Sequence, residues 1–225
     1  MPRTTLDREI HHLQDEVLLL GSMVEQALLD TMDALKRRDV EAARRVYQND
    51  HLINEKRFAI ENATLITIAT QQPMAHDLRF LAAILEVDTE LERMGDYAKG
   101  IAKIVISLND VAISIPNQEL TEMSQLAVGM LHRALSAFVN EDANLAQTIP
   151  PEDDQVDNLF NHTYHQLVTA MIANPQLIDY TNLLLWVVHN LERTADRVVN
   201  ICERTVFIVT GELMEIESPE DEEIL

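Results

Sequence analysis

The sequence predicts an all-α protein built from two tandem, pseudo-repeated three-helix bundles, six helices in all. Three observations predict this fold class. The 225 residues contain only five glycines and seven prolines, and are rich in Ala, Leu, Ile, Met and Glu, which favours helices over sheets. Apolar residues recur at steps of three and four, which is the helical period. The phrase Leu-Glu-Arg-x-x-Asp occurs twice, at residues 91–96 and 191–196.

Three long helical segments are predicted in the first half. Residues 4–37 form the first, and Asp39 is placed to cap a second helix over residues 40–70. Pro73 ends the second helix, because the residue before a proline is driven out of the α region. The third helix is predicted from about residue 74 to residue 108.

The pattern restarts after a predicted loop at residues 109–117. Asp142 can cap a helix, the Pro150-Pro151 pair interrupts it, and Gly211 suits the end of the last helix. The three helices are predicted over residues 120–139, 152–172 and 178–209. The sequence thus divides into a first bundle over residues 1–113, a second over residues 114–212, and a frayed acidic tail over residues 213–225.

Charge and composition limit the possible functions. The net charge of −21 argues against nucleic-acid binding, which needs a basic stripe, and favours contact with cations or basic protein surfaces. Cys202 is the single cysteine, so the chain has no internal disulfide framework. No signal peptide is apparent, and no apolar run approaches the length of a membrane span. We therefore expect a cytoplasmic protein without a membrane span.

Each half contains two acidic or amide pairs at positions i and i+4, which lie on one helical face. If the second and third helices of each half are antiparallel neighbours, both pairs face one groove. Oxygen donors of this kind suit a hard or borderline cation, here magnesium, manganese, iron or zinc. The predicted metal ligands are Asp50, Asn54, Glu92, Asp96, Asp153, Asp157, Glu192 and Asp196.

Other interpretations of the same residues remain open. Arg93 and Arg193 can make inter-helix ion pairs that hold the fold without a ligand. His189 lies one turn before Glu192 and is a possible extra ligand, whereas Trp186 is expected in the core. The sequence has no cysteine cluster for structural zinc, no second Glu-x-x-His, no nucleophile elbow and no phosphate-binding glycine loop. We therefore expect no enzyme activity and no catalytic residue.

At these motifs the sequence resembles the PhoU family, the accessory and regulatory proteins of bacterial and archaeal phosphate uptake. The likeness spans residues 5–212. The residues that carry it are Pro73, Asp77, Leu78 and Arg79; Leu91 to Asp96 with Ala98, Ile101 and Ala102; Leu191 to Asp196 with Asn200 and Ile201; and Asp50, Ile53 and Asn54.

The resemblance implies a cytoplasmic negative regulator that links a phosphate ABC transporter to a membrane sensor kinase, and it implies a homodimer. It also implies metal ions on the acidic motifs. Asn54 departs from the family pattern, and Gly100 and Lys103 stand where the second copy has Asn200 and Glu203. The first site is therefore expected to be the less acidic, with unequal metal occupancy.

Three alternatives remain at this point. The chain is a metal-independent helical scaffold in the first, and it regulates a transporter other than the phosphate transporter in the second. In the third it is a carboxylate-metal enzyme, an interpretation that the missing Glu-x-x-His partner disfavours.

Overall fold

The computed structural model describes residues 3–109 and 111–216, and six long helices account for most of them. They are α1 (Arg3–Arg37), α2 (Val40–Gln71), α3 (His76–Ser107), α4 (Asn117–Asn140), α6 (Asp153–Ala173) and α7 (Ile178–Thr210). A short helix α5 (Ala143–Thr148) and the 3₁₀ turns η1 (Pro150–Glu152) and η2 (Pro175–Leu177) join the later ones. The described residues contain no strand, so the predicted all-α class with six long helices is confirmed.

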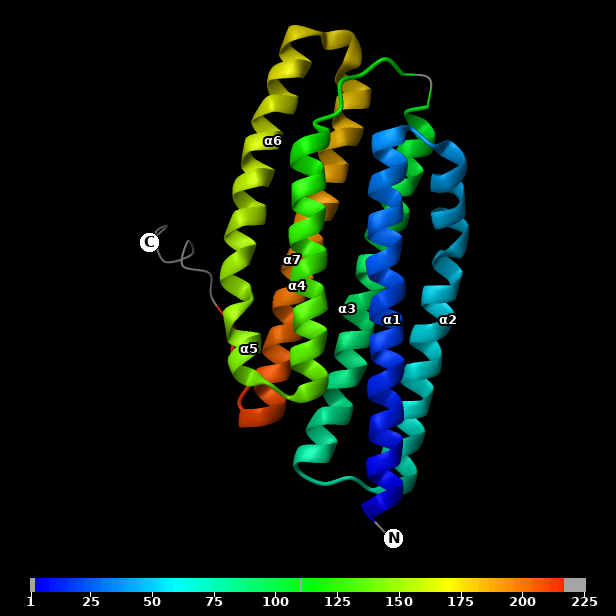
Figure 1. Cartoon of the computed structure of the whole chain (residues 1–225), viewed down its shortest axis with the longest axis vertical. Helices are drawn as coiled ribbons and strands as arrows, with labels where there is room; N and C mark the ends of the chain where they lie inside the picture. Colours follow the sequence, from blue (N-terminus) through cyan, green and yellow to red (C-terminus); the bar gives the residue numbers. More distant parts are fainter. Residues whose placement is uncertain (1–2, 110, 217–225) are drawn as a thin grey trace.

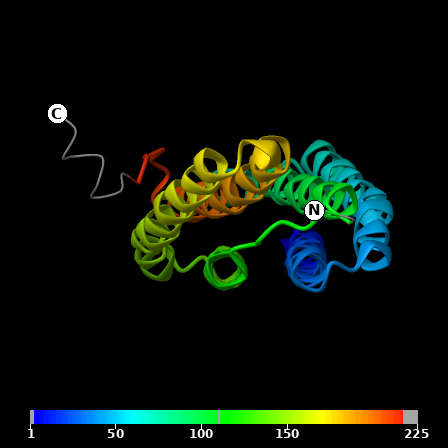
Figure 2. The same ribbon diagram turned by 90° about the horizontal axis from the view of Figure 1, so that it is seen from above.

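The six long helices run along the long axis of the molecule in two layers (Figure 1). Seen from above, α2, α3, α7 and α6 form one curved layer, and α1 and α4 lie against one side of it (Figure 2). Helix α1 packs on α2 and α3, whereas α4 packs on α6 and α7. Each half is therefore a three-helix unit, and α3 and α7 meet at the centre.

The buried apolar side chains of the described residues form one continuous core that both halves share. Phe80 of α3 stacks on Phe138 of α4, with their ring centroids 5.3 Å apart, so the two halves contribute to the same interior. The predicted boundary at residue 113 falls in the connection between α3 and α4. Arg38 fixes this connection by donating hydrogen bonds to the carbonyl oxygens of Val111 and Ile113. The division into two domains stays a prediction.

The helix ends follow the predicted local chemistry. Asp39 accepts a hydrogen bond from the backbone N–H of Ala42, and Asp142 accepts one from that of Leu145, so both predicted caps are present. Gly211 ends α7 with φ 79°, a left-handed conformation that glycine adopts at little cost. The Pro150-Pro151 pair breaks the second half into α5, η1 and α6 where the first half has the single helix α2.

Two expectations are corrected. Trp186 is 53% exposed, because Leu184, Val187 and Val188 occupy the buried face of α7 and the tryptophan lies off that face. Arg79 also contacts α7, because its Nε donates to the carbonyl oxygen of Ile208, 3.1 Å away, near the end of that helix.

The second correction concerns the tail. The predicted tail falls partly on residues 217–225, which lie outside the described residues. Ile216, by contrast, is described and is not frayed. Its backbone N–H donates to Glu203 Oε1 at 2.9 Å, and its side chain packs against the core.

Helix α1 approaches α4 closely at Gly21, where a Cβ atom would lie 2.2 Å from Leu135 Cδ1. We expect Gly21→Val to destabilise the protein by about 1–3 kcal/mol, because Leu135 is buried and has little room to move. Gly129→Ala in α4 is the matched control, because its added Cβ meets no atom within 4 Å. This change should stabilise by about 0.5–1 kcal/mol, since alanine is the better helix former. Urea unfolding measures both, and equal stability of the two variants would contradict the close approach.

Candidate functional site

The groove between α6 and α7 brings together all four acidic residues predicted in the second half. Asp153 and Asp157 lie in the first turns of α6, and Glu192 and Asp196 lie on the neighbouring α7. The pKa of Asp153 is raised to about 7, first by burial and then by the nearby charges of Asp157, Asp196 and Glu192. Burial, followed by the charges of Asp196 and Asp157, likewise raises the pKa of Glu192 to about 7. The four carboxylates therefore repel one another in a partly dry site.

Two oxygen atoms in this groove accept no hydrogen bond although they are buried. They are Asp153 Oδ1 and Glu192 Oε2. His189 Nδ1 lies 3.2 Å from Glu192 Oε2 but does not have the geometry of a hydrogen bond to it. The pKa of Asp196 is also raised, because neighbouring atoms displace water from it, and the charges of Arg193 and Arg197 oppose that rise. Excess negative charge with unsatisfied oxygens is the arrangement that a bound cation would stabilise.

The corresponding groove between α2 and α3 is built differently, because it contains its own cation. Lys99 Nζ lies 2.6 Å from Asp50 Oδ2 and 3.7 Å from Asp96 Oδ1. The side-chain amide of Asn54 donates to the same Asp50 oxygen at 3.1 Å. The hydrogen bond with Asp50 raises the pKa of Lys99, so the lysine stays charged. In Glu92, burial and then the charge of Asp96 raise the pKa.

Sequence reasoning missed Lys99, although a signal was present. Lys99 lies three residues after Asp96, on the same helical face, and its counterpart at the repeat offset of 100 is Val199. The first half thus places a lysine against its groove acids, and the second half has an apolar residue at the equivalent position. The expected difference between the two sites thus has a second physical cause, in addition to the change from an aspartate to Asn54.

The donor set fits a metal ion better in the second half than in the first. In the residue ranges that the structure describes, no three His, Cys, Asp or Glu side chains are arranged so that they could hold a metal ion together. The α6/α7 groove nevertheless offers four carboxylates and two unsatisfied buried oxygens, a set that suits a hard cation. In the α2/α3 groove the Lys99 ammonium already neutralises Asp50.

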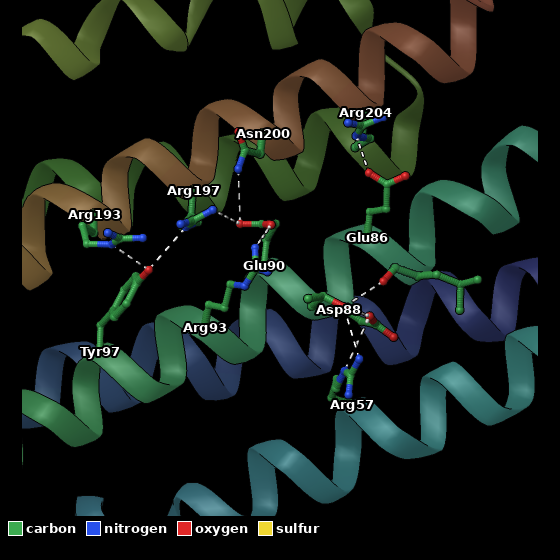
Figure 3. A network of polar contacts seen from close by, with 12 residues as sticks. Arg57, Glu86, Asp88, Glu90, Arg93, Tyr97, Arg193, Arg197, Asn200 and Arg204 are labelled. Carbon is green, nitrogen blue, oxygen red and sulfur yellow. Dashed lines mark hydrogen bonds and ion pairs between the residues drawn. The ribbon is translucent and has the colours of Figure 1, made fainter. Parts of the chain in front are cut away.

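Polar side chains tie α3 to α7 between the two grooves (Figure 3). Glu90 of α3 meets Arg197 at 3.4 Å and Asn200 at 3.3 Å, both on α7. Tyr97 Oη accepts hydrogen bonds from Arg193 Nε at 3.0 Å and from Arg197 Nε at 3.3 Å. Further along, Arg204 Nε lies 2.7 Å from Glu86 Oε2.

This network corrects the expectation that both arginines of the repeated phrase make inter-helix ion pairs. Arg193 does cross to α3, but it meets the hydroxyl and the ring of Tyr97 rather than an acid. Arg93 stays on its own helix and pairs with Glu90 at 2.7 Å.

A buried ion pair lies one turn from Glu92 and was not predicted. Asp88 is fully buried, and Arg57 Nε of α2 is 3.9 Å from its Oδ1 (Figure 3). Burial raises the pKa of Asp88 to about 7, and the charge of Arg57 partly opposes this shift. Its position four residues before Glu92, on the same helical face, was the available signal.

The geometry defines a helical repeat protein with one acidic groove in each half, and comparison with known proteins assigns its family. The family model described as PhoU domain matches residues 6–105 and 120–205. The phosphate-specific transport system accessory protein PhoU homolog of Streptococcus pneumoniae is 35% identical over 214 residues, covering 95% of this chain and 99% of the relative. PhoU homolog 1 of Methanothermobacter thermautotrophicus is 34% identical over 212 residues, covering 94% and 97%.

Solved structures agree with this assignment. The crystal structure of the phosphate transport system regulatory protein PhoU from Streptococcus pneumoniae matches with a TM-score of 0.86 at 33% identity, covering 93% of this chain and 99% of that chain. The crystal structure of PhoU from Pseudomonas aeruginosa also gives a TM-score of 0.86, at 30% identity and with 92% and 99% coverage. The chain therefore belongs to the PhoU family.

The described helices are long, but their apolar residues are interspersed with charged ones. None of them contains a segment that combines sufficient length, high hydropathy and few charges to cross a bilayer.

The raised pKa values predict a pH dependence of stability in chelator. Asp153 and Glu192 have pKa values of about 7 in the folded protein and ordinary values of 3.8 and 4.5. Between these limits the folded state binds more protons than the unfolded state, so stability falls as pH rises from about 4 to 7. Asp153→Asn/Glu192→Gln should flatten this slope and stabilise the protein at pH 8 by on the order of 1 kcal/mol. Urea unfolding at several pH values measures the effect.

Asp88 titrates in both proteins, so the difference between the two curves isolates the groove pair. Parallel curves for the wild type and the double variant would show that Asp153 and Glu192 do not repel their neighbours as described.

Proposed function

We propose that this chain is a cytoplasmic negative regulator of phosphate uptake that couples a phosphate ABC transporter to a membrane sensor kinase. The observation that supports the proposal is family membership over nearly the whole chain, together with relatives named as accessory proteins of phosphate-specific transport. The regulator acts by protein–protein contact rather than by catalysis, and it works as a homodimer. Its strongly acidic surface suits basic surfaces on its partners.

Metal ions belong to this proposal at the acidic grooves. In the second half Asp153, Asp157, Glu192 and Asp196 would hold magnesium, manganese, iron or zinc, and the ion would neutralise carboxylates that otherwise repel one another. In the first half Asp50, Asn54, Glu92 and Asp96 are the corresponding set. A metal there competes with the Lys99 ammonium, so binding is weaker.

The regulatory function is tested in a strain that lacks the chain. Phosphate-starvation genes should be expressed in phosphate-rich medium in this strain, and the full-length chain should repress them again. A reporter fused to a phosphate-starvation promoter measures the result. Unchanged repression in the deleted strain would contradict negative regulation, and a normal kinase response without transporter contact would contradict the coupling.

Metal occupancy is tested by exchanging residues between the halves. Asn54→Asp/Lys99→Val gives the first groove the residues of the second, and it should increase the metal bound to the purified protein because the competing ammonium is gone. Val199→Lys introduces the competing cation into the second groove and should decrease it. Glu192→Ala/Asp196→Ala should remove more metal than Glu92→Ala/Asp96→Ala. Elemental analysis of protein prepared without chelator measures each.

The outcome would reject the assignment of the metal ligands if all four variants carried as much metal as the wild type. Equal losses from the two double alanine variants would instead reject the inequality between the grooves.

A further inference from the structure

Four aromatic side chains form a chain of three ring contacts beside the acidic α6/α7 groove. Ring centroids lie 6.1 Å apart for Tyr164 and Phe160, 6.4 Å apart for Phe160 and His189, and 5.8 Å apart for His189 and Trp186. Tyr164 is 43% exposed and Trp186 is 53% exposed. We name these four residues the aromatic patch. Large rings left open to solvent in mutual contact are typical of a contact surface.

Comparison of the repeats shows that the fold itself does not require aromatic residues here. At the offsets of 103 for α6 and 100 for α7, the first-half counterparts are Arg57, Glu61, Glu86 and Thr89. These residues make ion pairs and hydrogen bonds within the first half and to α7. Arg57 pairs with Glu61 at 3.4 Å and donates to Thr89 at 3.3 Å, and Glu86 pairs with Arg204 at 2.7 Å. The polar residues at this surface of the first half therefore pair with one another or with α7, whereas the second half exposes aromatic rings.

The acidic groove lies directly beside the aromatic patch. His189 belongs to the patch, and its Nδ1 is 3.2 Å from Glu192 Oε2 in the groove. Val199 stands where the first half has Lys99, so the second groove lacks that internal cation. A divalent metal ion would still leave four carboxylates with a net negative charge. A ligand of this surface must therefore combine positive charge with apolar area.

We propose that the aromatic patch, with the acidic groove beside it, is the docking site for a basic, arginine-bearing segment of a partner protein. A guanidinium group stacks on the faces of Trp186 and Tyr164 and pairs with the adjacent carboxylates, which a compact ammonium does less well. Apolar side chains of the same segment continue onto Ile172 and Ile178, which are exposed at the nearby ends of α6 and α7. This proposal rests on the proposed function only in taking the partner to be a protein.

Trp186 is the single tryptophan of the chain, so its fluorescence reports on the patch alone. The probe is a synthetic amphipathic peptide with arginines on one face and leucines on the other, and the control peptide has glutamate in place of arginine. The arginine peptide should change the emission of Trp186, and the glutamate peptide should leave it unchanged. Calorimetry measures affinity in variants that lack the tryptophan.

Trp186→Ala and Tyr164→Ala should each weaken binding of the arginine peptide about fivefold or more. Phe58→Ala is the matched control, because Phe58 is an aromatic residue of α2 with 58% exposure that lies outside the patch, and this variant should bind as the wild type does. Both patch residues are exposed, so their removal should leave the fold intact, and circular dichroism checks this.

Three results would overturn the proposal: no emission change at millimolar peptide, equal binding of the two peptides, or the same affinity in Phe58→Ala and the two patch variants. The binding test uses purified full-length protein, whereas the proposed function is tested by gene expression in cells. If the purified protein binds the arginine peptide but deletion of the chain leaves gene repression unchanged, the regulatory function is rejected and the docking site is not. If deletion abolishes repression but the purified protein does not bind the peptide, only the docking site is rejected.

Discussion

The packing of α3 against α7 is the constraint on which the rest of the structure depends. Both helices carry the repeated Leu-Glu-Arg phrase, and successive residues of a helix point about 100° apart. Leu91 and Leu191 are therefore buried in the shared core, while the following glutamates turn toward the grooves. In α7 the next residue, Arg193, turns to α3 and meets Tyr97. Three consecutive residues thus serve the core, the groove and the contact between halves.

The two repeats solve the same electrostatic problem in different ways. Each places acidic side chains between two neighbouring helices, α2 and α3 in the first half and α6 and α7 in the second, where burial makes their charge costly. The first half places Lys99 against Asp50 and Arg57 near Asp88, so each of these buried acids has a cation beside it, although Asp50 Oδ1 and Asp88 Oδ2 accept no hydrogen bond. The second half leaves Asp153 and Glu192 with unsatisfied oxygens. The two halves thus share one fold and differ at single positions in the grooves, such as Lys99 and Val199.

Much of the fold could be predicted from the sequence, because helix length, capping and chain breaks are local properties. Asp39, Asp142 and Gly211 act at the helix ends as their residue types suggest. The facing of the acidic pairs followed from the repeat and the antiparallel packing of neighbours. The prediction that failed, the burial of Trp186, depended on how the helices pack against one another. The exposure of Trp186 depends on which face of α7 the other half covers, and no local pattern records that.

The shared core also has a consequence for how the chain is made. Synthesis from the N-terminus completes α1, α2 and α3 well before α7, the last helix, emerges to cover α3. Throughout that interval one edge of α3 has no neighbour. The side chains on that edge include Glu86, Glu90 and Tyr97 (Figure 3), so the nascent chain presents charge and a hydroxyl to water there. These polar side chains thus remain hydrated until α7 is made and supplies their partners Arg193, Arg197 and Arg204.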